Sequence, residues 1–432
     1  MLHDPGSYSE PLIIDHIDLS NKEKDVLRRL TDEIAGIAAL PVHKEKAVLW
    51  RKLNDLEPER PMVWINEIPW HEMNVNDELT LQCQDPWARD LETKLRRAIY
   101  QWKHMPADMV INPWIECPLA IHSTDFGIVE DVEIARTDPN NDIYSRHFNI
   151  QIREPEDIEK IHLPKVTHYE KTTEVTFETM KELFSDVIEV RKVGQTHIWF
   201  TPWDYLIRWW GIEEAMIDLV MRPEMVHDAV DRMVDAWMVE LDQFEEQNLL
   251  SLDCNNTRIG SGGYGYVSDL PGEDFNPERV KPKNMWGCSN AQIFSSVSPE
   301  MHWEFAIQHD MRWLSRWGLV YYGCCEPLDK KIDILRRIPN LRKISVSPWN
   351  NLPLILSEIG SNYVASIKPN PACFLDSNWE PEVVYKELQD KVQCAASNKT
   401  PAEIIMKDIS TVQYHPERLW QWSDLVMKVV TQ

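Results

Sequence analysis

The sequence predicts an α/β protein, a parallel (β/α)8 TIM barrel with a helical N-terminal extension. Runs of strand type begin near residues 62, 108, 187, 249, 319, 342, 362 and 403, and most alternate with runs whose apolar residues have helical spacing. About eight strands alternating with helices favour a closed parallel sheet, which takes about 250 residues. The 432 residues leave room for additions at the N-terminus, and no linker divides the chain. We therefore expect a single domain over 1–432.

The first 60 residues are predicted to form a helical cap, because two helices precede the first strand. Ser20 is a suitable N-cap for the first of these helices. Pro86 stands at the first position of a third helix, and Thr201 with Asp204 has the spacing of a capping box before a fifth. We expect helices over residues 22–39, 44–53, 85–103, 172–184, 202–211, 212–221, 223–247, 299–317, 381–396 and 416–430. We expect strands over residues 62–66, 108–120, 187–193, 196–200, 249–254, 319–322, 342–346, 362–368 and 403–407, with a polar excursion or hairpin over 121–165.

The most informative stretch is WGLVYYGCCEPLD, residues 317–329. Its strand-like run ends at Gly323, and Cys324, Cys325 and Glu326 follow directly. In a barrel of parallel strands, the residues after each strand form the face that carries catalysis. The pair of thiols beside a carboxylate is therefore a candidate site. The alternative is that both thiols are buried as small apolar groups.

The composition restricts the class of partner. The chain has 45 Lys and Arg against 70 Asp and Glu, a formal net charge of −25, which repels nucleic acid and anionic membranes. The N-terminus lacks the pattern of a secretory signal, and no apolar run is long enough to span a membrane. The eight cysteines are scattered apart from one adjacent pair, which favours a reduced, cytoplasmic setting.

Other polar and aromatic residues follow predicted strands. Asp253 and Asn255 are candidates for orienting a substrate or passing a proton, although a structural cap is the alternative for Asp253; Glu116 is a further acid–base candidate. The 19 tryptophans suggest an aromatic-lined cavity or a broad interface, against the alternative that they fill a core. The aromatic candidates for gripping a substrate are Trp199, Trp203, Trp286, Trp349 and Tyr322.

Four runs carry a resemblance to a known family: IREPEDIEKIHLPKV (152–166), PWDYLIRWWGIEEAMIDLVMRPEMVHDAV (202–230), SVSPEMHWEFAIQHD (296–310) and YYGCCEPLD (321–329). Together they resemble the uroporphyrinogen decarboxylase superfamily over roughly residues 105–430. That superfamily includes a porphyrinogen decarboxylase and zinc-dependent, corrinoid-linked methyltransferases. Decarboxylation of a polyanionic porphyrinogen is not expected from a chain of this charge.

The resemblance implies a zinc site, although the residues at the ligand positions differ from those of the methyltransferases. The methyltransferases carry His-x-Cys where this chain has Tyr322-Gly323-Cys324, and no cysteine stands near Lys407 where a further one is expected. Zinc accepts thiolate and carboxylate ligands. The candidate ligands here are Cys324, Cys325, Glu326 and Cys373, and adjacent cysteines rarely both bind one zinc.

The resemblance also implies the reaction. We expect transfer of a methyl group from a small aromatic methyl ether to the cobalt of a corrinoid (cobalamin) carried by a partner protein, which is O-demethylation. Two alternatives stay open, namely transfer from a methylcorrinoid to a thiol, and a non-catalytic barrel that binds a ligand. A homodimer is one open option for the oligomeric state.

Overall fold

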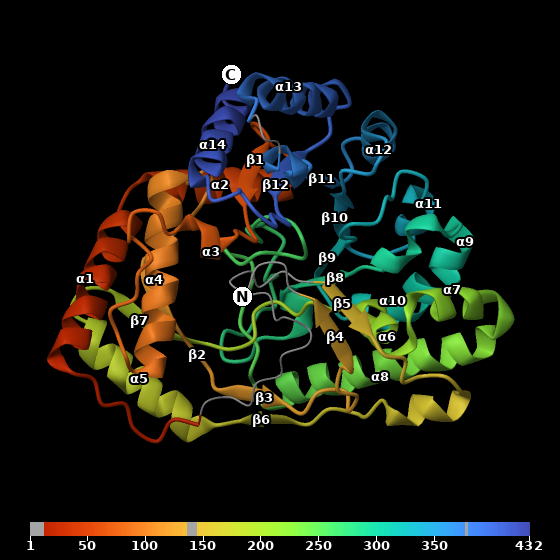
Figure 1. The fold of residues 1–432 in the computed structure, drawn as a ribbon, viewed down its shortest axis with the longest axis horizontal. Coiled ribbons are helices and arrows are strands. Elements are labelled where there is room, and N and C mark those ends of the chain that lie inside the picture. The colour runs from red at the N-terminus through yellow and green to blue at the C-terminus, as the bar shows by residue number, and fades with distance from the viewer. Residues whose placement is uncertain (1–12, 136–144, 376–378) are drawn as a thin grey trace.

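The computed structural model describes residues 13–135, 145–375 and 379–432. The main sheet has six strands, all parallel, and they neighbour one another in chain order except that the first strand pairs with the last. Helices lie around the outside of this sheet (Figure 1). In spatial order the strands are β1 (Met62–Ile65), β12 (Ala402–Met406), β11 (Val364–Ile367), β10 (Leu341–Val346), β9 (Leu319–Tyr322) and β8 (Trp286–Ser289). The prediction of an α/β protein with a parallel sheet is therefore confirmed.

The predicted closure of the sheet into a (β/α)8 barrel is not confirmed. Between β8 and β1 the described chain forms only a separate parallel pair, β2 (Trp114–Pro118) with β7 (Glu189–Val193), and an isolated parallel bridge between Gln195 and Leu250. A further link to β8 comes from a side chain, because the Asp253 carboxylate accepts hydrogen bonds from the Trp286 backbone N–H at 3.0 and 3.2 Å. The sheet is therefore open between β8 and β1, where these contacts stand in place of a continuous ladder of strand hydrogen bonds.

Two predicted strands are wrong for the same reason. Residues 196–200 and 249–254 have strand-like composition but no strand ladder, apart from the bridge at Leu250. By contrast β8 was not predicted, since its four residues include a glycine and no β-branched residue. Pairing with β9 on a buried face fixes β8 as a strand.

Most predicted helices are confirmed to within a few residues. Ser20 and Glu23 form a complete capping box before α1, and Asp85 caps α4 with Pro86 at the first position. The predicted capping box at Thr201 is wrong, because no side-chain cap forms there. The longer helices are α1 (Asn21–Ala38), α2 (Val42–Asn54), α4 (Pro86–His104), α5 (Glu170–Phe184), α6 (Pro202–Trp210), α7 (Ile212–Met221), α8 (Pro223–Glu246), α12 (Leu352–Ile359), α13 (Pro381–Ser397) and α14 (Pro416–Val430).

Shorter helices connect the strands. The predicted helix before β9 is interrupted by a π-helical turn, so that α9 (Pro299–His302) and α10 (Gln308–Leu314) flank residues Trp303–Ile307. The remaining short α-helices are α3 (Trp70–Met73) and α11 (Ile332–Leu335). The 3-10 helices cover Pro155–Lys160, Pro282–Asn284, Gln292–Ser296 and Pro371–Phe374.

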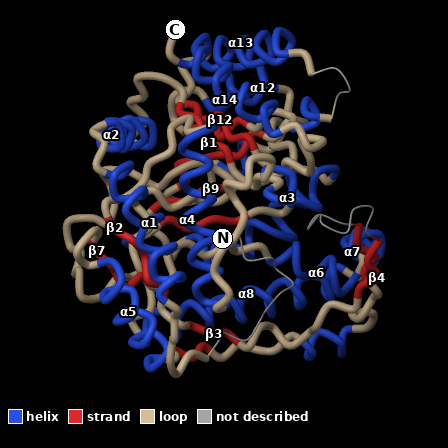
Figure 2. The backbone as a smooth tube through the Cα atoms, turned by 60° about the vertical axis from the view of Figure 1, so that its left-hand side comes forward, coloured by secondary structure: helices blue, strands red, loops and turns tan. Residues whose placement is uncertain are grey.

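The polar excursion after β2 contains two antiparallel pairs. The first joins β3 (Ile121–Ser123) to β6 (Val166–His168), and the second joins β4 (Val132–Ala135) to β5 (Ser145–Phe148). These short strands lie apart from the main sheet (Figure 2). The predicted hairpin within 121–165 is thus confirmed in its described parts.

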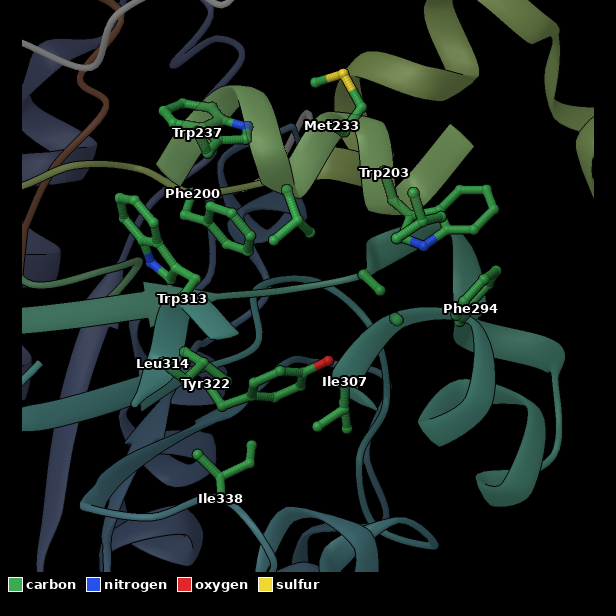
Figure 3. Packing of buried hydrophobic residues seen from close by; sticks show 14 of the residues in the cluster. Phe200, Trp203, Met233, Trp237, Phe294, Ile307, Trp313, Leu314, Tyr322 and Ile338 are labelled. Atoms are coloured by element: carbon green, nitrogen blue, oxygen red, sulfur yellow. The ribbon is translucent and has the colours of Figure 1, made fainter. Parts of the chain in front are cut away.

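The largest apolar core lies between the sheet and helices α6, α8 and α10. It contains many aromatic rings among its aliphatic side chains, and Phe200 and Trp313 stack with their centroids 4.6 Å apart (Figure 3). A second core cluster joins α1, α4 and α5 on the N-terminal side. Among the described helices, none has both the length and the apolar character that a bilayer crossing needs.

Candidate functional site

Reactive side chains gather where β9, β12 and β1 end. Cys324 and Cys325 follow β9, Lys407 and Asp408 follow β12, and Glu67 follows β1. The register pairs Ile65 with Met406, which brings the ends of β1 and β12 side by side. We call these five residues the thiol–lysine cluster.

The two thiols contact each other and a lysine. Their Sγ atoms are 3.6 Å apart, and Lys407 Nζ lies 3.9 Å from Cys324 Sγ. Cys324 is buried and Cys325 is half-buried. The hydrogen bond between the thiols and burial raise the pKa of Cys324 well above its ordinary value, and the same hydrogen bond lowers the pKa of Cys325. As the pH rises, Cys325 therefore loses its proton before Cys324 does.

Lys407 is held in a charged state by its neighbours. Its Nζ donates to Asp408 Oδ2 at 2.6 Å and lies 3.5 Å from Glu67 Oε2. Burial lowers the pKa of Lys407, but the negative charges of the thiol pair, Glu67 and Asp408 outweigh burial and raise the pKa above its ordinary value. The site thus holds a permanent ammonium beside the thiols.

Glu67 connects the cluster to Arg258, which lies just before the glycine-rich segment of residues 260–265. It is 3.0 Å from Arg258 Nη1, and it accepts the Asp408 backbone N–H at 3.0 Å. Burial raises the pKa of Glu67, but Arg258 and Lys407 outweigh this effect and lower the pKa to about 2. Glu67 and Asp408 have φ of 51° and 56°.

A second lysine lies within the sheet near the thiols. Lys368, directly after β11, donates to Tyr321 Oη at 2.6 Å and to Ser345 Oγ at 2.8 Å. Burial lowers the pKa of Lys368 to about 7, against the opposing influence of negative charge on the thiol pair. Lys368 therefore exchanges protons near neutral pH.

The predicted zinc ligands are not brought together. The Glu326 oxygens accept the backbone N–H groups of Ala291 and Cys324 at 3.1 and 2.9 Å, which fixes this buried carboxylate to the backbone. Cys373 packs against a different apolar cluster with Phe374 and Trp379. Among the residues that the structure describes, no group of three or more His, Cys, Asp or Glu is placed to hold a metal ion. The four residues do not fit one zinc site in this arrangement, and zinc stays a prediction.

The predicted acid–base residues lie in three different settings. Asp253 is fully buried, bridges to β8, and its Oδ2 lies 3.7 Å from His197 Nδ1. Asn255 Oδ1 closes a local turn by accepting the Thr257 N–H and hydroxyl at 2.8 and 2.7 Å. Glu116 is exposed on β2. Their catalytic roles stay predictions, and the visible contacts of Asp253 and Asn255 are structural.

The aromatic residues that were predicted to contact a substrate lie partly in the core and partly nearer the surface. Trp203, Trp286 and Tyr322 are fully buried, and each places its polar atom on a partner: the Phe305 carbonyl, the Gly265 carbonyl and His302. Figure 3 shows Trp203 and Tyr322 among packed apolar side chains. Trp199 is half-buried, and Trp349 is 69% exposed. Substrate contact by these residues stays a prediction, because the described positions assign the first three to the core.

The sequence analysis missed Lys368 and Lys407 as site residues. Both directly follow a fully buried strand of four or five residues. A lysine at the end of a buried strand needs a partner for its charge, and this signal alone marks both positions.

Comparison with known proteins adds little to this site. The chain matches no protein-family model and no curated protein. Among solved structures, a methyltransferase from Methanosarcina mazei matches with a TM-score of 0.49 and 10% sequence identity, covering 88% of this chain and 97% of that chain. A likeness at this level carries no argument about fold or activity.

Proposed function

We propose that the chain is a methyltransferase that moves a methyl group from a small methoxylated aromatic compound to the cobalt of a corrinoid on a partner protein. The observation that carries this proposal is the thiol pair beside the Lys407 ammonium at the ends of parallel strands. The four sequence runs that resemble the uroporphyrinogen decarboxylase superfamily support the same reaction class. The proposal uses no zinc.

The cluster meets the main chemical demand of ether demethylation. Breaking the bond between methyl carbon and aryl oxygen leaves a phenolate, whose negative charge a cation or a proton must neutralise. Burial and the hydrogen bond to Cys325 raise the pKa of Cys324, so this thiol keeps its proton and is the proposed donor to the leaving oxygen.

Four members of the cluster then have a role. Cys325 and Asp408 are accessible and would face the substrate, while buried Cys324 holds the shared proton. Lys407 stabilises the negative charge that remains on the sulfurs once the proton has left. The corrinoid supplies the nucleophile that takes the methyl group.

The test combines the purified chain, a reduced corrinoid and a series of methoxylated aromatics, with phenol release and methyl–cobalt absorbance as readouts. Phenol should form only when the corrinoid is present. Lys407→Met should lower the rate about 100-fold, as loss of one charge-stabilising donor does in other enzymes. Lys331→Met is the matched control, because Lys331 is also buried but donates to the Phe294 carbonyl instead. Demethylation without cobalt, or full activity of Lys407→Met, would contradict the proposal.

A further inference from the structure

The two sulfurs of the thiol–lysine cluster are close enough to react with each other. Cys324 Sγ and Cys325 Sγ are 3.6 Å apart, and all eight cysteines of the chain are free thiols. The backbone of Cys324 is fixed, because its N–H donates to Glu326 Oε2 at 2.9 Å and its carbonyl accepts the Ser345 hydroxyl at 2.6 Å. Two groups held in contact react far more readily than the same groups free in solution. The geometry therefore favours chemistry between these thiols.

The two thiols differ in their access to solvent, which gives them different parts in such a reaction. Cys325 is half-buried and lies 3.7 Å from a carboxylate oxygen of Asp408, whose side chain is 51% exposed. Cys324 is buried, and the Lys407 ammonium lies 3.9 Å from its sulfur. A reagent in solution therefore meets Cys325 first, beside an exposed negative charge. The Lys407 charge favours a thiolate on Cys324, and the thiolate is the nucleophile of thiol–disulfide exchange.

We propose that Cys324 and Cys325 form a reversible disulfide with each other when the protein meets a small disulfide that carries no negative charge. In the first step, the Cys325 thiolate attacks one sulfur of the small disulfide, whose S–S bond breaks and releases a thiolate that takes up a proton. In the second step, Cys324 loses its proton to solvent, and its sulfur attacks Cys325 Sγ and displaces the other small thiolate, which is protonated in turn. The cysteine pair is oxidised, and the small disulfide is reduced to two thiols.

The bond is expected to be easily reduced again. Adjacent Cα atoms are about 3.8 Å apart across a trans peptide, whereas the Cα atoms of a disulfide are usually about 4.4–6.8 Å apart. A disulfide between neighbours is therefore strained, and strained disulfides are the labile ones. The effect on activity rests on the proposed function: the oxidised pair has no thiol proton for the leaving oxygen, so methyl transfer should stop until the bond is reduced.

Mass spectrometry of the full chain after treatment with cystamine tests the proposal. Cystamine is a cationic disulfide, which suits the Asp408 carboxylate beside Cys325 and the net charge of −25. The tryptic peptide 317–330 contains Cys324 and Cys325 and no other cysteine. This peptide should lose two hydrogen atoms and carry no cysteamine, and reduced glutathione should restore its mass.

Single variants separate the two steps. Cys324→Ala removes the second step, so peptide 317–330 should keep one cysteamine on Cys325. Cys325→Ala leaves only the buried thiol, and modification of the peptide should slow about tenfold or more. Cys394→Ala is the matched control: it removes a half-buried thiol on α13 and should change the rate of disulfide formation in peptide 317–330 by less than about twofold.

The parent chain decides the outcome even if a variant fails to fold. A cysteamine that persists on the parent peptide overturns the proposal, and so does a parent peptide that stays unmodified at millimolar cystamine. These masses are measured without a methyl donor or a corrinoid, so a lack of methyl transfer contradicts the proposed function alone. Where the reduced chain does transfer methyl groups, equal rates for the reduced and the oxidised chain would overturn the inhibitory effect.

Discussion

The two adjacent cysteines of the thiol–lysine cluster have different environments. Cys324 is buried against Lys407, whereas Cys325 is half-buried and lies 3.7 Å from Asp408 Oδ2. One thiolate beside one thiol is favoured because the hydrogen bond between them stabilises the charge, and a second thiolate would be repelled. Reactivity at this site should therefore belong to Cys325.

We predict that Cys325 alkylates with a midpoint below the ordinary thiol pKa of about 8.5. The sign follows from its lowered pKa, since a lower pKa gives thiolate at lower pH. Cys324→Ala should raise the midpoint, because it removes the hydrogen bond that stabilises the thiolate. The measurement is the rate of iodoacetamide labelling against pH, resolved by peptide mass spectrometry.

Cys394 is the internal control for this measurement. It is also half-buried, but burial raises its pKa, so its midpoint should lie above that of Cys325. Identical midpoints for Cys325 and Cys394 would show that the thiol pair does not activate either sulfur.

At the scale of the element, the end of β9 depends on one glycine. Gly323 has φ of 97°, and a Cβ there would lie 2.6 Å from Leu328 Cδ1 and 3.0 Å from Ser345 Cβ. This turn sets the direction of the chain into Cys324, whose carbonyl accepts the Ser345 hydroxyl at 2.6 Å. The position of the thiols therefore depends on a backbone conformation at residue 323 that residues other than glycine adopt only at a cost in free energy.

Gly323→Ala should lower the free energy of unfolding by about 2–4 kcal/mol, from unfavourable backbone conformation and steric overlap. Urea denaturation measures this change. Gly36→Ala in α1 is the control, since nothing lies within 4 Å of its Cβ; it should be neutral or stabilise by up to about 1 kcal/mol. Equal effects of the two substitutions would argue against strain at Gly323.

The helices were predictable because their signals are local. The capping box of Ser20 and the proline after Asp85 each lie within four residues of the helix that they begin. The strands were less predictable, because strand composition at residues 196–200 and 249–254 does not supply a partner for pairing. Trp286–Ser289 pairs despite weak composition, since β9 lies beside it.

The site was predictable to a similar extent. Cys324 and Cys325 were predicted because they follow a strand that its composition makes recognisable. Glu326 was predicted as a ligand beside them, but its carboxylate accepts hydrogen bonds from backbone N–H groups instead. Lys407 was overlooked although its place after a buried strand marks it, whereas its contact with Glu67 forms only through the pairing of β1 with β12. Contacts of this kind depend on topology, which no short motif contains.

For the whole molecule, an ion pair in the interior joins two strands of the sheet that have one strand between them. Lys343 on β10 and Glu403 on β12 lie 3.0 Å apart, and both side chains are 0% exposed. Glu403 also accepts the Gly263 N–H at 3.0 Å, and Lys343 donates to the Tyr264 carbonyl at 3.2 Å. This pair thus connects two strands and the glycine-rich segment.

Lys343→Met should destabilise the protein by about 3–5 kcal/mol, because it leaves the Glu403 charge buried without its partner. Lys386→Met, which breaks an exposed pair with Asp390 on α13, should cost less than about 0.5 kcal/mol. Both values come from urea denaturation. A loss below about 1 kcal/mol for Lys343→Met would show that water or protonation relieves the buried carboxylate.

The pairing of β1 with the last strand also has a consequence for protein synthesis. Met62 lies beside Glu403, so the partner of one edge of β1 is synthesised roughly 340 residues later. At typical translation rates that edge stays unpaired for tens of seconds. The other edge has partners that follow it closely in the sequence: the Asp108 carboxylate accepts the Val63 N–H, and the Gln101 amide donates to the Ile65 carbonyl. A nascent chain can therefore hold β1 on one side with side chains made shortly after it. The opposite edge stays unpaired until β12 has been synthesised and has left the ribosome.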